Sequence, residues 1–230
     1  MKSSSTSINE IERINELNHY KIIDTLPEDL FDDITQLASQ ICCTPIAVIT
    51  LVDVNRQWFK SKTGLDITET PRDVSFCGHA ILGNGLFEIP NAIKDPRFFD
   101  NPLVVGEPNI RFYAGLPLVT KLGFKLGTLC VIDPKPNKLK PEQHASLVIL
   151  GRQVVLLIEN RLTTQDSAIL SSLLEHTGDI AKVGGWQLET ANMKTEWTKQ
   201  VFNIHELQPP DLPSVAEAII FLCPRSSTYH

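Results

Sequence analysis

Two side chains able to do chemistry, Cys77 and His79, lie two residues apart in this 230-residue sequence. A thiolate next to an imidazole can act as a nucleophile or as a redox sensor. On a helix, however, side chains i and i+2 point about 200° apart, so these two cannot act directly on one substrate. The pattern favours Cys77 as a small apolar filler and His79 as a ring bonded to the backbone, with metal or haem ligation by His79 as a less favoured alternative.

Arg111 is a second candidate, since a guanidinium can bind an anionic ligand through two parallel hydrogen bonds. It can also pair with Asp73 or Asp95 and hold the loops together, which is the interpretation that the sequence favours. Asp95 precedes a proline and suits a helix cap better than a ligand contact. The five cysteines form no CxxC pair and have no zinc spacing, so no metal site is predicted.

Composition limits the class of protein. Apolar residues make up 42% of the chain and charged residues 21%, as in ordinary globular proteins of one or two domains. The formal net charge of −6 argues against nucleic acid or an anionic membrane as a partner. Residues 1–7 are polar and are predicted to be disordered rather than a signal peptide. With an odd number of cysteines and no membrane-length apolar run, a cytoplasmic protein with reduced thiols is expected.

Two helices are predicted before the first strand. The first covers Ile8–Tyr20, and the second begins at a capping box, Thr25–Glu28, with a proline in its first turn. Four apolar residues recur along the second helix at the spacing of one helical face. This predicted inner face comprises Leu30, Ile34, Leu37 and Ile41.

The predicted strands belong to one antiparallel sheet in an α+β fold. Ile46–Val52 is apolar on both faces and is therefore expected to be central, and Arg56–Lys62 carries Trp58 and Phe59 on opposite faces. A proline, Pro117, inside the next long strand implies an edge or a bulge. The other predicted strands are Phe87–Ile89, Arg111–Val119 and Lys125–Asp133, with Leu126, Thr128, Cys130 and Ile132 on one face of the last.

The stretch Gly64–Asn109 contains little regular structure apart from a short helix, Phe76–Leu82, which Ser75 is placed to cap. Gly64–Asp73 and Leu103–Asn109 are predicted to be loops, with a helical turn from Asp95 between them. We expect the terminal helices to cover one face of the sheet and this stretch to cover the other. Structured loops of this length, roughly 45 residues, are usually lids or pocket walls.

One long helix is predicted over Pro141–Thr177, with Gly178 suited to its end. It carries two adjacent apolar stripes, which can face the body of the domain and a second copy of the helix at the same time. The stripes comprise Leu147, Leu150, Val154, Leu157 and Arg161, and Val148, Gly151, Val155, Ile158 and Leu162. Residues 162–177 are interpreted as a connector between two domains, paired in a homodimer.

Six stretches in this order resemble a bacterial GAF domain of the type that precedes sensor histidine kinases and diguanylate cyclases. They are Arg56–Lys60, Glu69–Asp73, Ser75–Ile81, Asp95–Phe98, Arg111–Leu118 and Leu126–Asp133. The resemblance covers residues 8–161 and implies a six-stranded antiparallel sheet, a small-molecule pocket under the middle loops and a dimer through the terminal helices. The candidate pocket residues are Phe76, Cys77, His79, Asp95, Phe98, Arg111, Phe112, Tyr113, Thr128 and Cys130.

Residues 178–230 resemble the opening of a PAS domain. The stretches that carry this resemblance are Gly184–Glu189, Thr195–Trp197 and Val201–His205. Only about half of a PAS domain is present, so an incomplete PAS-like segment is expected. Residues 221–230 depart from the usual continuation of the family, which leads to the hypothesis of a frame slip near Phe221.

These resemblances imply a sensory module that binds a small molecule or senses redox state. It would act through the paired helix on a histidine kinase or diguanylate cyclase domain outside this chain. The chain carries no kinase or cyclase motif, so no catalytic residue and no enzyme activity are predicted, and the ligand and any cofactor remain unnamed. Two alternatives stay open. One is a ligand-free GAF dimerisation module, and the other is an enzyme that reduces free methionine sulfoxide with Cys42, Cys43, Cys77 and Cys130.

Overall fold

The computed structural model describes residues 9–181, 185–189 and 194–207. The predicted disorder of residues 1–7 and the hypothesis about residues 221–230 lie outside the described residues. Contacts divide the chain into two compact units, Met1–Leu162 and Thr163–His230, which are described separately. No helix among the described residues is long and apolar enough to cross a membrane.

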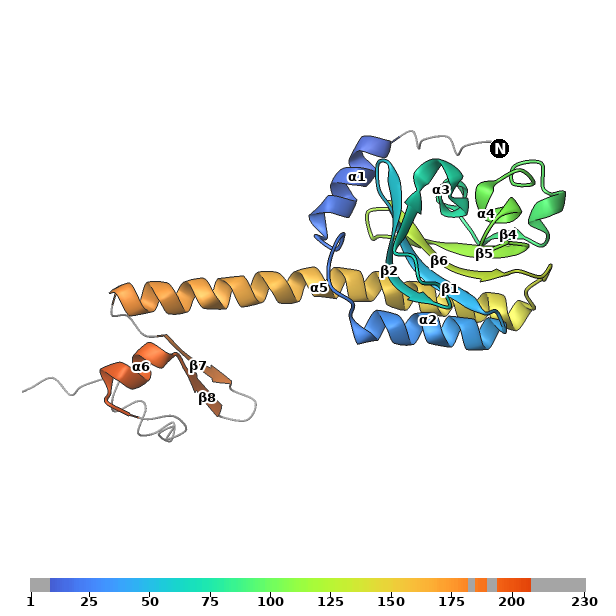
Figure 1. Cartoon of the computed structure of the whole chain (residues 1–230). Coiled ribbons are helices and arrows are strands. Elements are labelled where there is room, and N and C mark those ends of the chain that lie inside the picture. The colour runs from blue at the N-terminus through green and yellow to red at the C-terminus, as the bar shows by residue number, and fades with distance from the viewer. Residues whose placement is uncertain (1–8, 182–184, 190–193, 208–230) are drawn as a thin grey trace, which may run out of the picture. The chain divides into compact units, whose positions relative to one another are not determined.

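The first unit is built on a six-stranded antiparallel sheet, as the resemblance implied (Figure 1). Its spatial order is β3-β2-β1-β6-β5-β4. The strands are β1 (Ile46–Val52), β2 (Arg56–Thr63), β3 (Glu69–Pro71), β4 (Phe87–Ile89), β5 (Phe112–Val119) and β6 (Lys125–Asp133). β1 and β6 lie at the centre, and every residue of β1 is buried, as its two apolar faces predict.

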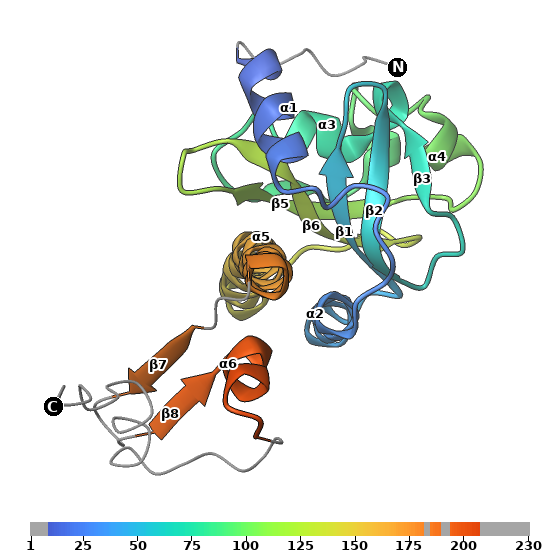
Figure 2. The ribbon, with the colours of Figure 1, turned by 90° about the vertical axis from the view of Figure 1, so that its left-hand side faces the viewer.

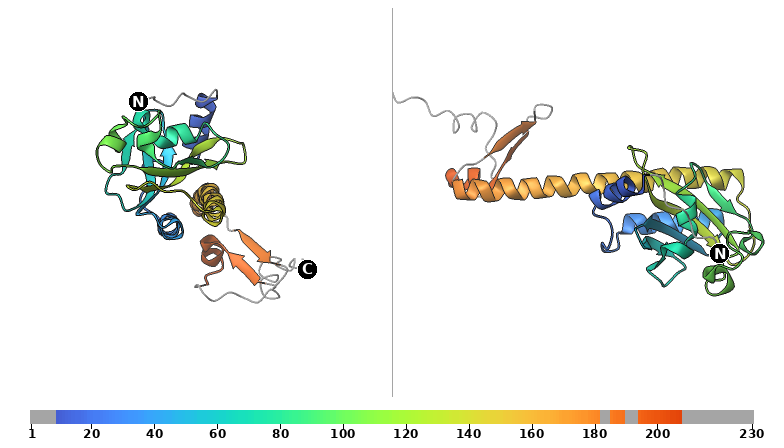
Figure 3. Two further views of the ribbon diagram at one scale, coloured as in Figure 1. Left: turned by 90° about the vertical axis from the view of Figure 1, so that its right-hand side faces the viewer. Right: turned by 90° about the horizontal axis from the view of Figure 1, so that it is seen from above.

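Helices lie on both faces of the sheet (Figures 2 and 3). Helices α2 and α5 cover one face, and the short α3 and α4 cover the other. The helices are α1 (Glu10–His19), α2 (Asp29–Cys42), α3 (Phe76–Ala80), α4 (Pro102–Val105) and α5 (Pro141–Ala181), with short 3-10 turns η1 (Arg72–Val74) and η2 (Ala92–Lys94). Of the terminal helices, α2 and α5 form the layer that we expected, and the middle stretch forms the opposite layer.

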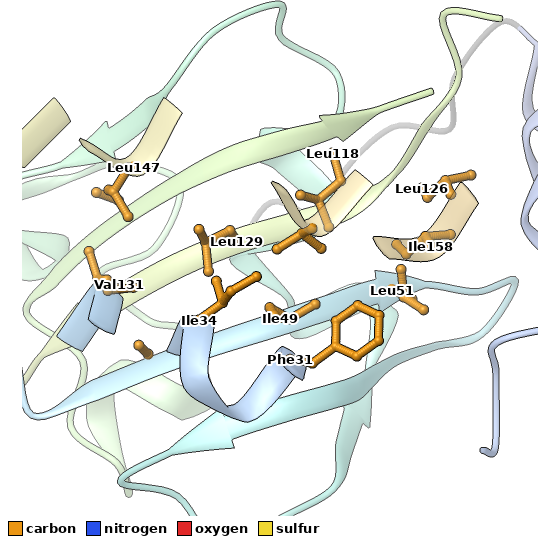
Figure 4. Close-up of a cluster of buried hydrophobic side chains, with 14 of the residues drawn as sticks. Phe31, Ile34, Ile49, Leu51, Leu118, Leu126, Leu129, Val131, Leu147 and Ile158 are labelled. Atoms are coloured by element: carbon orange, nitrogen blue, oxygen red, sulfur yellow. The ribbon is translucent and has the colours of Figure 1, made fainter. Parts of the chain in front are cut away.

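Two hydrophobic cores result, one on each face of the sheet. The larger core packs inward side chains of β1, β5 and β6 against α2 and α5 (Figure 4). It contains Phe31, Ile34, Ile49, Leu51, Leu118, Leu129, Val131, Leu147 and Ile158. The smaller core lies under α3 and α4 and contains Val48, Phe59, Phe76, Phe98, Tyr113, Cys130 and Ile132. Trp58 and Phe59 point into different cores, as predicted.

The predicted inner face of α2 is wrong, apart from Ile34. The side chains of Leu30, Leu37 and Ile41 are 62%, 46% and 38% exposed. The helix instead buries Phe31, Ile34, Thr35, Ala38 and Cys42, a stripe shifted by one position. Two apolar stripes run side by side on this helix, and the sequence spacing alone does not tell which one meets the sheet.

The predicted capping box at Thr25–Glu28 is also wrong. Glu28 is the N-cap residue, its side chain makes no capping hydrogen bond, and the helix begins at Asp29. The hydroxyl of Thr25 donates to the carbonyl oxygen of Ile22 at 2.8 Å. Thr25 therefore closes the preceding turn instead of capping the helix.

Three further elements differ from the prediction. Part of the predicted loop Gly64–Asp73 forms β3, and Pro102–Val105 forms α4, where Asn101 accepts a capping hydrogen bond from the backbone of Leu103. A register irregularity between β5 and β6 sends Leu126 into the larger core, away from Cys130 and Ile132. Ser75 does cap α3, accepting a 2.9 Å hydrogen bond from the Gly78 amide.

Pro117 sits in β5 without breaking the sheet. The neighbouring strand β4 pairs only with Tyr113–Gly115, so Pro117 lies past the end of that ladder. Its missing N–H therefore faces an open edge, and the opposite side of β5 stays paired with β6. The prediction of an edge or a bulge is confirmed.

Helix α5 runs past Gly178 to Ala181, so the predicted end is wrong. Its buried residues within the first unit are Leu147, Gly151, Val154 and Ile158, which come from both predicted stripes. A Cβ on Gly151 would overlap Leu116, so the glycine lets the helix approach β5 closely. The role of residues 162–177 as a connector stays a prediction.

The second unit contains an antiparallel pair, β7 (Trp186–Glu189) and β8 (Lys194–Trp197), followed by α6 (Lys199–Ile204). The rings of Trp197 and Phe202 lie 5.6 Å apart and help to pack α6 on β8. These elements overlap the stretches that resemble a PAS opening. Assignment to that family stays a prediction.

Candidate functional site

A small cavity lies in the core under α3 and α4, against the face of β1, β2, β5 and β6. Its volume is about 30 Å³. It is lined by Val48, Thr50, Gln57, Phe59, Leu65, Ile67, Thr70, Phe76, Cys77, Leu103, Pro108, Ile110, Tyr113, Cys130 and Ile132. Ligand pockets usually measure about 300–1,000 Å³, so the space in this structure suits one or two water-sized molecules.

Two polar side chains border the cavity where β2 pairs with β3. Gln57 and Thr70 are directly opposed across the two strands. Both are more than nine-tenths buried, with 6% and 7% of their surface exposed. Gln57 Oε1 and Thr70 Oγ1 accept no hydrogen bond from a described protein group and donate none. A buried polar atom without a partner is costly, so this end of the cavity is prepared for a polar group.

Two thiols and a phenol meet at the other end of the cavity. Cys77 Sγ lies 3.9 Å from Cys130 Sγ, and the Tyr113 hydroxyl donates to Cys77 Sγ at 3.1 Å. Two buried threonine hydroxyls, of Thr50 and Thr128, lie 3.1 Å apart beside them. A Cβ on Gly115 would overlap Tyr113 Oη, so this glycine makes room for the phenol along its own strand.

These contacts shift the protonation of the sulfurs in opposite directions. Burial raises the pKa of Cys77, but side-chain hydrogen bonding with Cys130, Thr128, Thr50 and Tyr113 outweighs it and brings the pKa down to about 7. The hydrogen bond with Cys77, together with burial, raises the pKa of Cys130 well above its usual value. Burial and the neighbouring sulfurs raise the pKa of Tyr113. Cys77 is therefore the more acidic thiol of the pair.

The family follows from comparison with known proteins. The sequence pattern of the GAF domain matches residues 26–158, which is more than half of the chain. The chain belongs to the GAF domain family. The resemblance recognised in the sequence is thus confirmed at the level of the family.

A curated relative of this GAF protein is a cyclic di-GMP phosphodiesterase of Pseudomonas aeruginosa. The two are 50% identical over 121 residues, which is 53% of this chain and 21% of the relative. The chain therefore spans about a fifth of the length of that relative. Half of the matched residues are shared, so the matched parts have the same fold.

Solved structures agree with the GAF fold. The GAF domain of an Acinetobacter phosphoenolpyruvate-protein phosphotransferase has a TM-score of 0.50 and 18% identity, covering 67% of this chain and 95% of that one. The blue-light absorbing form of the Thermosynechococcus elongatus PixJ GAF domain also has a TM-score of 0.50, at 12% identity, covering 73% and 96%. At this identity the likeness describes the fold alone.

Four of the ten candidate residues, Phe76, Cys77, Tyr113 and Cys130, line the cavity of this GAF domain. Thr128 is buried beside it, and Phe98 stacks on the outer side of Phe76 with ring centroids 4.1 Å apart. Phe112, next to Tyr113 on β5, points into the opposite core. Strand alternation explains why these two neighbours separate.

The polar candidates lie outside the cavity wall. The ring of His79 packs edge-on against Phe98 at 4.9 Å. Asp95 binds Arg97, whose hydrogen bonds lower the pKa of that carboxyl. Arg111 donates to the carbonyl oxygens of Val104 and Ile110, so it holds α4 and pairs with neither aspartate that we had considered.

The cysteines do not assemble as the enzyme alternative would require. Cys42 lies in the larger core on the opposite face of the sheet, and Cys43 is exposed. Of the four cysteines that the structure describes, Cys77 and Cys130 are the two whose sulfurs meet across the fold. Among the described residues no group of three or more histidine, cysteine or acidic side chains is placed to hold a metal ion.

Gln57 and Thr70 were not among the predicted site residues. A usable signal was present at Gln57, because the predicted strand Arg56–Lys62 places it on the same face as Phe59. A glutamine on a buried face needs a partner, and that requirement marks it as a candidate. Thr70 carried no such signal, because β3 was predicted to be a loop.

A second polar cluster connects β2 with α2 and α5. The ammonium of Lys60 is fully buried and donates to Thr25 Oγ1, Leu26 O and Glu28 Oε1 at 2.9, 2.8 and 2.7 Å. Arg161, on α5, donates to the same Glu28 oxygen at 2.9 Å. Although burial raises the pKa of Glu28, its bonds to Lys60 and Arg161 lower it overall. Lys60 directly follows the cavity residue Phe59 in the chain. The register between β1 and β2 shifts at this point, where Ile49 pairs with Ser61 and Thr50 pairs with Phe59.

Proposed function

We propose that this chain is the sensory part of a signalling protein, in which the GAF domain binds a small molecule and passes the change to α5. The observation that carries the proposal is the buried cavity with two unpartnered polar atoms, Gln57 Oε1 and Thr70 Oγ1. A ligand that donates a hydrogen bond to Gln57 would satisfy a group that the protein leaves bare.

The lining defines the class of ligand. None of the lining residues carries a carboxylate, an amine, a guanidinium or an imidazole, and most are aliphatic or aromatic. An anionic ligand such as a cyclic dinucleotide would lose its hydration there without gaining an opposite charge. The ligand is therefore not an anion, and it is mostly apolar, with one or two polar groups. It has only a few heavy atoms unless the segments around Leu65–Ile67 and Leu103–Ile110 move outward.

The proposed relay runs through β2. Phe59 lines the cavity, while the next residue, Lys60, binds the N-terminal side of α2 and, through Glu28, the Arg161 side chain of α5. A ligand that binds one arrangement of β2 more tightly increases the population of that arrangement. The contacts of Lys60 with Glu28, and of Glu28 with Arg161, then carry the change to α2 and α5. The apolar side chains of Ile149 and Leu156, 55% and 44% exposed on α5, support a homodimer through this helix.

The output domain is the next part of the proposal. The sequence analysis named a histidine kinase or a diguanylate cyclase. The P. aeruginosa relative, which shares half of the matched residues, is named a cyclic di-GMP phosphodiesterase. We therefore favour an output domain in cyclic di-GMP turnover, outside this chain. A cytoplasmic location, and the absence of enzyme activity in the chain itself, remain parts of this proposal.

The ligand-free dimerisation module is the second candidate, and the size of the cavity favours it. Stacked aromatic rings of Phe76, Phe98 and Tyr113 fill most of the space under α3. The volume of the cavity that remains is about 30 Å³. In this alternative the domain has lost its ligand and contributes only a dimer interface.

Native mass spectrometry of the full chain, as purified, separates the two candidates. Extra mass that is absent after denaturation, and absent from a Gln57→Leu variant, is the result expected for the sensory module. A native mass equal to that of the protein alone, both at neutral pH and under mildly destabilising conditions, would contradict ligand binding and favour the second candidate. The same spectra report two chains per particle for a dimer, and a monomer at micromolar concentration would contradict the helix pairing in both.

A further inference from the structure

The cavity wall brings together two thiols that are far apart in the sequence. Cys77 Sγ on α3 lies 3.9 Å from Cys130 Sγ on β6, 53 positions further along the chain. A disulfide requires about 2.05 Å between the sulfurs, so the distance still to be closed is about 1.9 Å. We propose that Cys77 and Cys130 are a redox modification site, at which a small peroxide converts the two thiols into a reversible disulfide.

The contacts give the two sulfurs different roles. The Tyr113 hydroxyl donates to Cys77 Sγ at 3.1 Å, and such a hydrogen bond stabilises a thiolate. The thiol of Cys130 donates to the carbonyl oxygen of Val48 at 3.6 Å and stays protonated. The shift of the Cys77 pKa to about 7 agrees with this geometry. Cys77 is thus the attacking sulfur, and Cys130 is the one that resolves the intermediate.

The size of the cavity selects the oxidant. Both sulfurs line a space of about 30 Å³, and the remaining lining residues leave little room for a bulky reagent. Hydrogen peroxide has two heavy atoms and fits a space of one or two water molecules. A tripeptide disulfide such as oxidised glutathione does not fit. The pair therefore responds to peroxide in preference to the thiol–disulfide exchange that exposed cysteines undergo.

The reaction needs two steps and no other reactant. The Cys77 thiol first gives up its proton to water, its thiolate sulfur attacks one peroxide oxygen, the O–O bond breaks, and the leaving hydroxide takes up the released proton and departs as water. Cys77 is now a sulfenic acid. The sulfur of Cys130 then attacks Cys77 sulfur, the S–O bond breaks, and the hydroxide leaves with the Cys130 proton as a second water. Two thiols lose two electrons in total, and one peroxide becomes two waters.

The test uses the reduced, folded full chain. It is treated with hydrogen peroxide, unfolded in an alkylating reagent and mapped by peptide mass spectrometry. We expect a cross-linked pair of peptides that contain Cys77 and Cys130, lighter by two hydrogen atoms than the separate peptides, and restored by dithiothreitol. The bridge should form at a rate independent of protein concentration. It should persist in a Cys43→Ser variant, which removes the exposed thiol.

Two results would overturn the proposal. One is that Cys77 and Cys130 both remain alkylatable at a peroxide dose that oxidises Cys43. The other is that Cys77 proceeds to sulfinic acid, or pairs with a different cysteine, without the bridge. Because the mapping is done on the natural sequence, neither result can be attributed to a misfolded variant. Both sulfurs line the cavity of the proposed ligand, so the mapping is done on protein that has been unfolded, stripped and refolded.

A Tyr113→Phe variant tests the assignment of roles. Phenylalanine keeps the buried ring and removes only the hydroxyl that donates to Cys77. Loss of one hydrogen bond to a charged group should slow bridge formation about tenfold. An unchanged rate, with a circular dichroism spectrum like that of the natural protein, would show that the hydroxyl does not activate the thiol. The role of Tyr113 in activating Cys77 would then be wrong.

Discussion

Replacement of Gln57 by leucine tests whether the end of the cavity at Gln57 and Thr70 holds an unpartnered polar group. Leucine keeps the approximate size of the side chain and removes Oε1. This oxygen has no hydrogen-bond partner among the described protein groups, and the residue is 6% exposed. A buried acceptor without a partner costs about 1–3 kcal/mol. The adjoining space of about 30 Å³ can hold a water that offsets part of this cost. We therefore expect the ligand-free variant to be more stable than the natural protein by about 1 kcal/mol.

The assay is thermal unfolding of protein that has been unfolded, stripped and refolded. For a unit of this size 1 kcal/mol corresponds to about 2–4 °C, so the midpoint of Gln57→Leu should rise by that amount. Gln36→Leu, on the exposed side of α2, is the matched control and should change the free energy of unfolding by less than about 0.5 kcal/mol.

Comparison with protein as purified completes the experiment. A bound ligand stabilises the folded state according to its concentration and dissociation constant, so natural protein should have a higher midpoint before stripping than after it. Gln57→Leu should show little difference between the two preparations. A midpoint for ligand-free Gln57→Leu below that of the ligand-free natural protein would contradict the absence of a partner for Oε1, because it would mean that Oε1 makes a stabilising bond inside the protein.

Further predictions concern stability. Lys60→Met removes the ammonium that binds three oxygens and should lower the free energy of unfolding by about 2 kcal/mol in urea titrations, and a loss below about 0.5 kcal/mol would contradict the role of this cluster. Burial raises the pKa of Glu10, but Arg13 and Arg72 lower it to about 2. The ionised carboxylate therefore contributes fully to the free energy of unfolding above the unfolded-state pKa of 4.5, and this contribution is lost as pH falls from there toward 2. Glu10→Gln should therefore flatten the stability profile in that window, and an unchanged slope would count against the pairing. Gly127→Ala should destabilise by at least about 3 kcal/mol in the same titration, because its Cβ would overlap the Thr50 carbonyl, whereas Gly85→Ala, with open space around it, should behave as natural protein.

Much of the sheet could be predicted from the sequence, because its signals are local. Ile46–Val52 is apolar at every position, and this requires a strand covered on both faces. Trp58 and Phe59 alternate between the two cores as strand geometry demands. Serine is a preferred residue at helix N-caps, and the hydroxyl oxygen of Ser75 accepts a hydrogen bond from the Gly78 amide.

The errors arise where the deciding contact is distant in sequence. The inward stripe of α2 is selected by the sheet that it packs on, and Leu30, Leu37 and Ile41 satisfied the same spacing on the outer side. Strand β3 exists because Gln57 and Thr70 pair across 13 positions, and its three residues have no strand pattern of their own. The meeting of Cys77 with Cys130 likewise depends on how α3 lies on β6, which the sequence does not encode locally.

Ligand binding in this cavity can be tested by a crystal structure of the protein as purified. We expect a non-protein group in the cavity, with a polar atom within hydrogen-bond distance of Gln57 Oε1 or Thr70 Oγ1 and an apolar part against Phe59 and Ile110. A cavity closed by side chains, with Gln57 turned to bond another protein group and no space for a ligand, would contradict ligand binding.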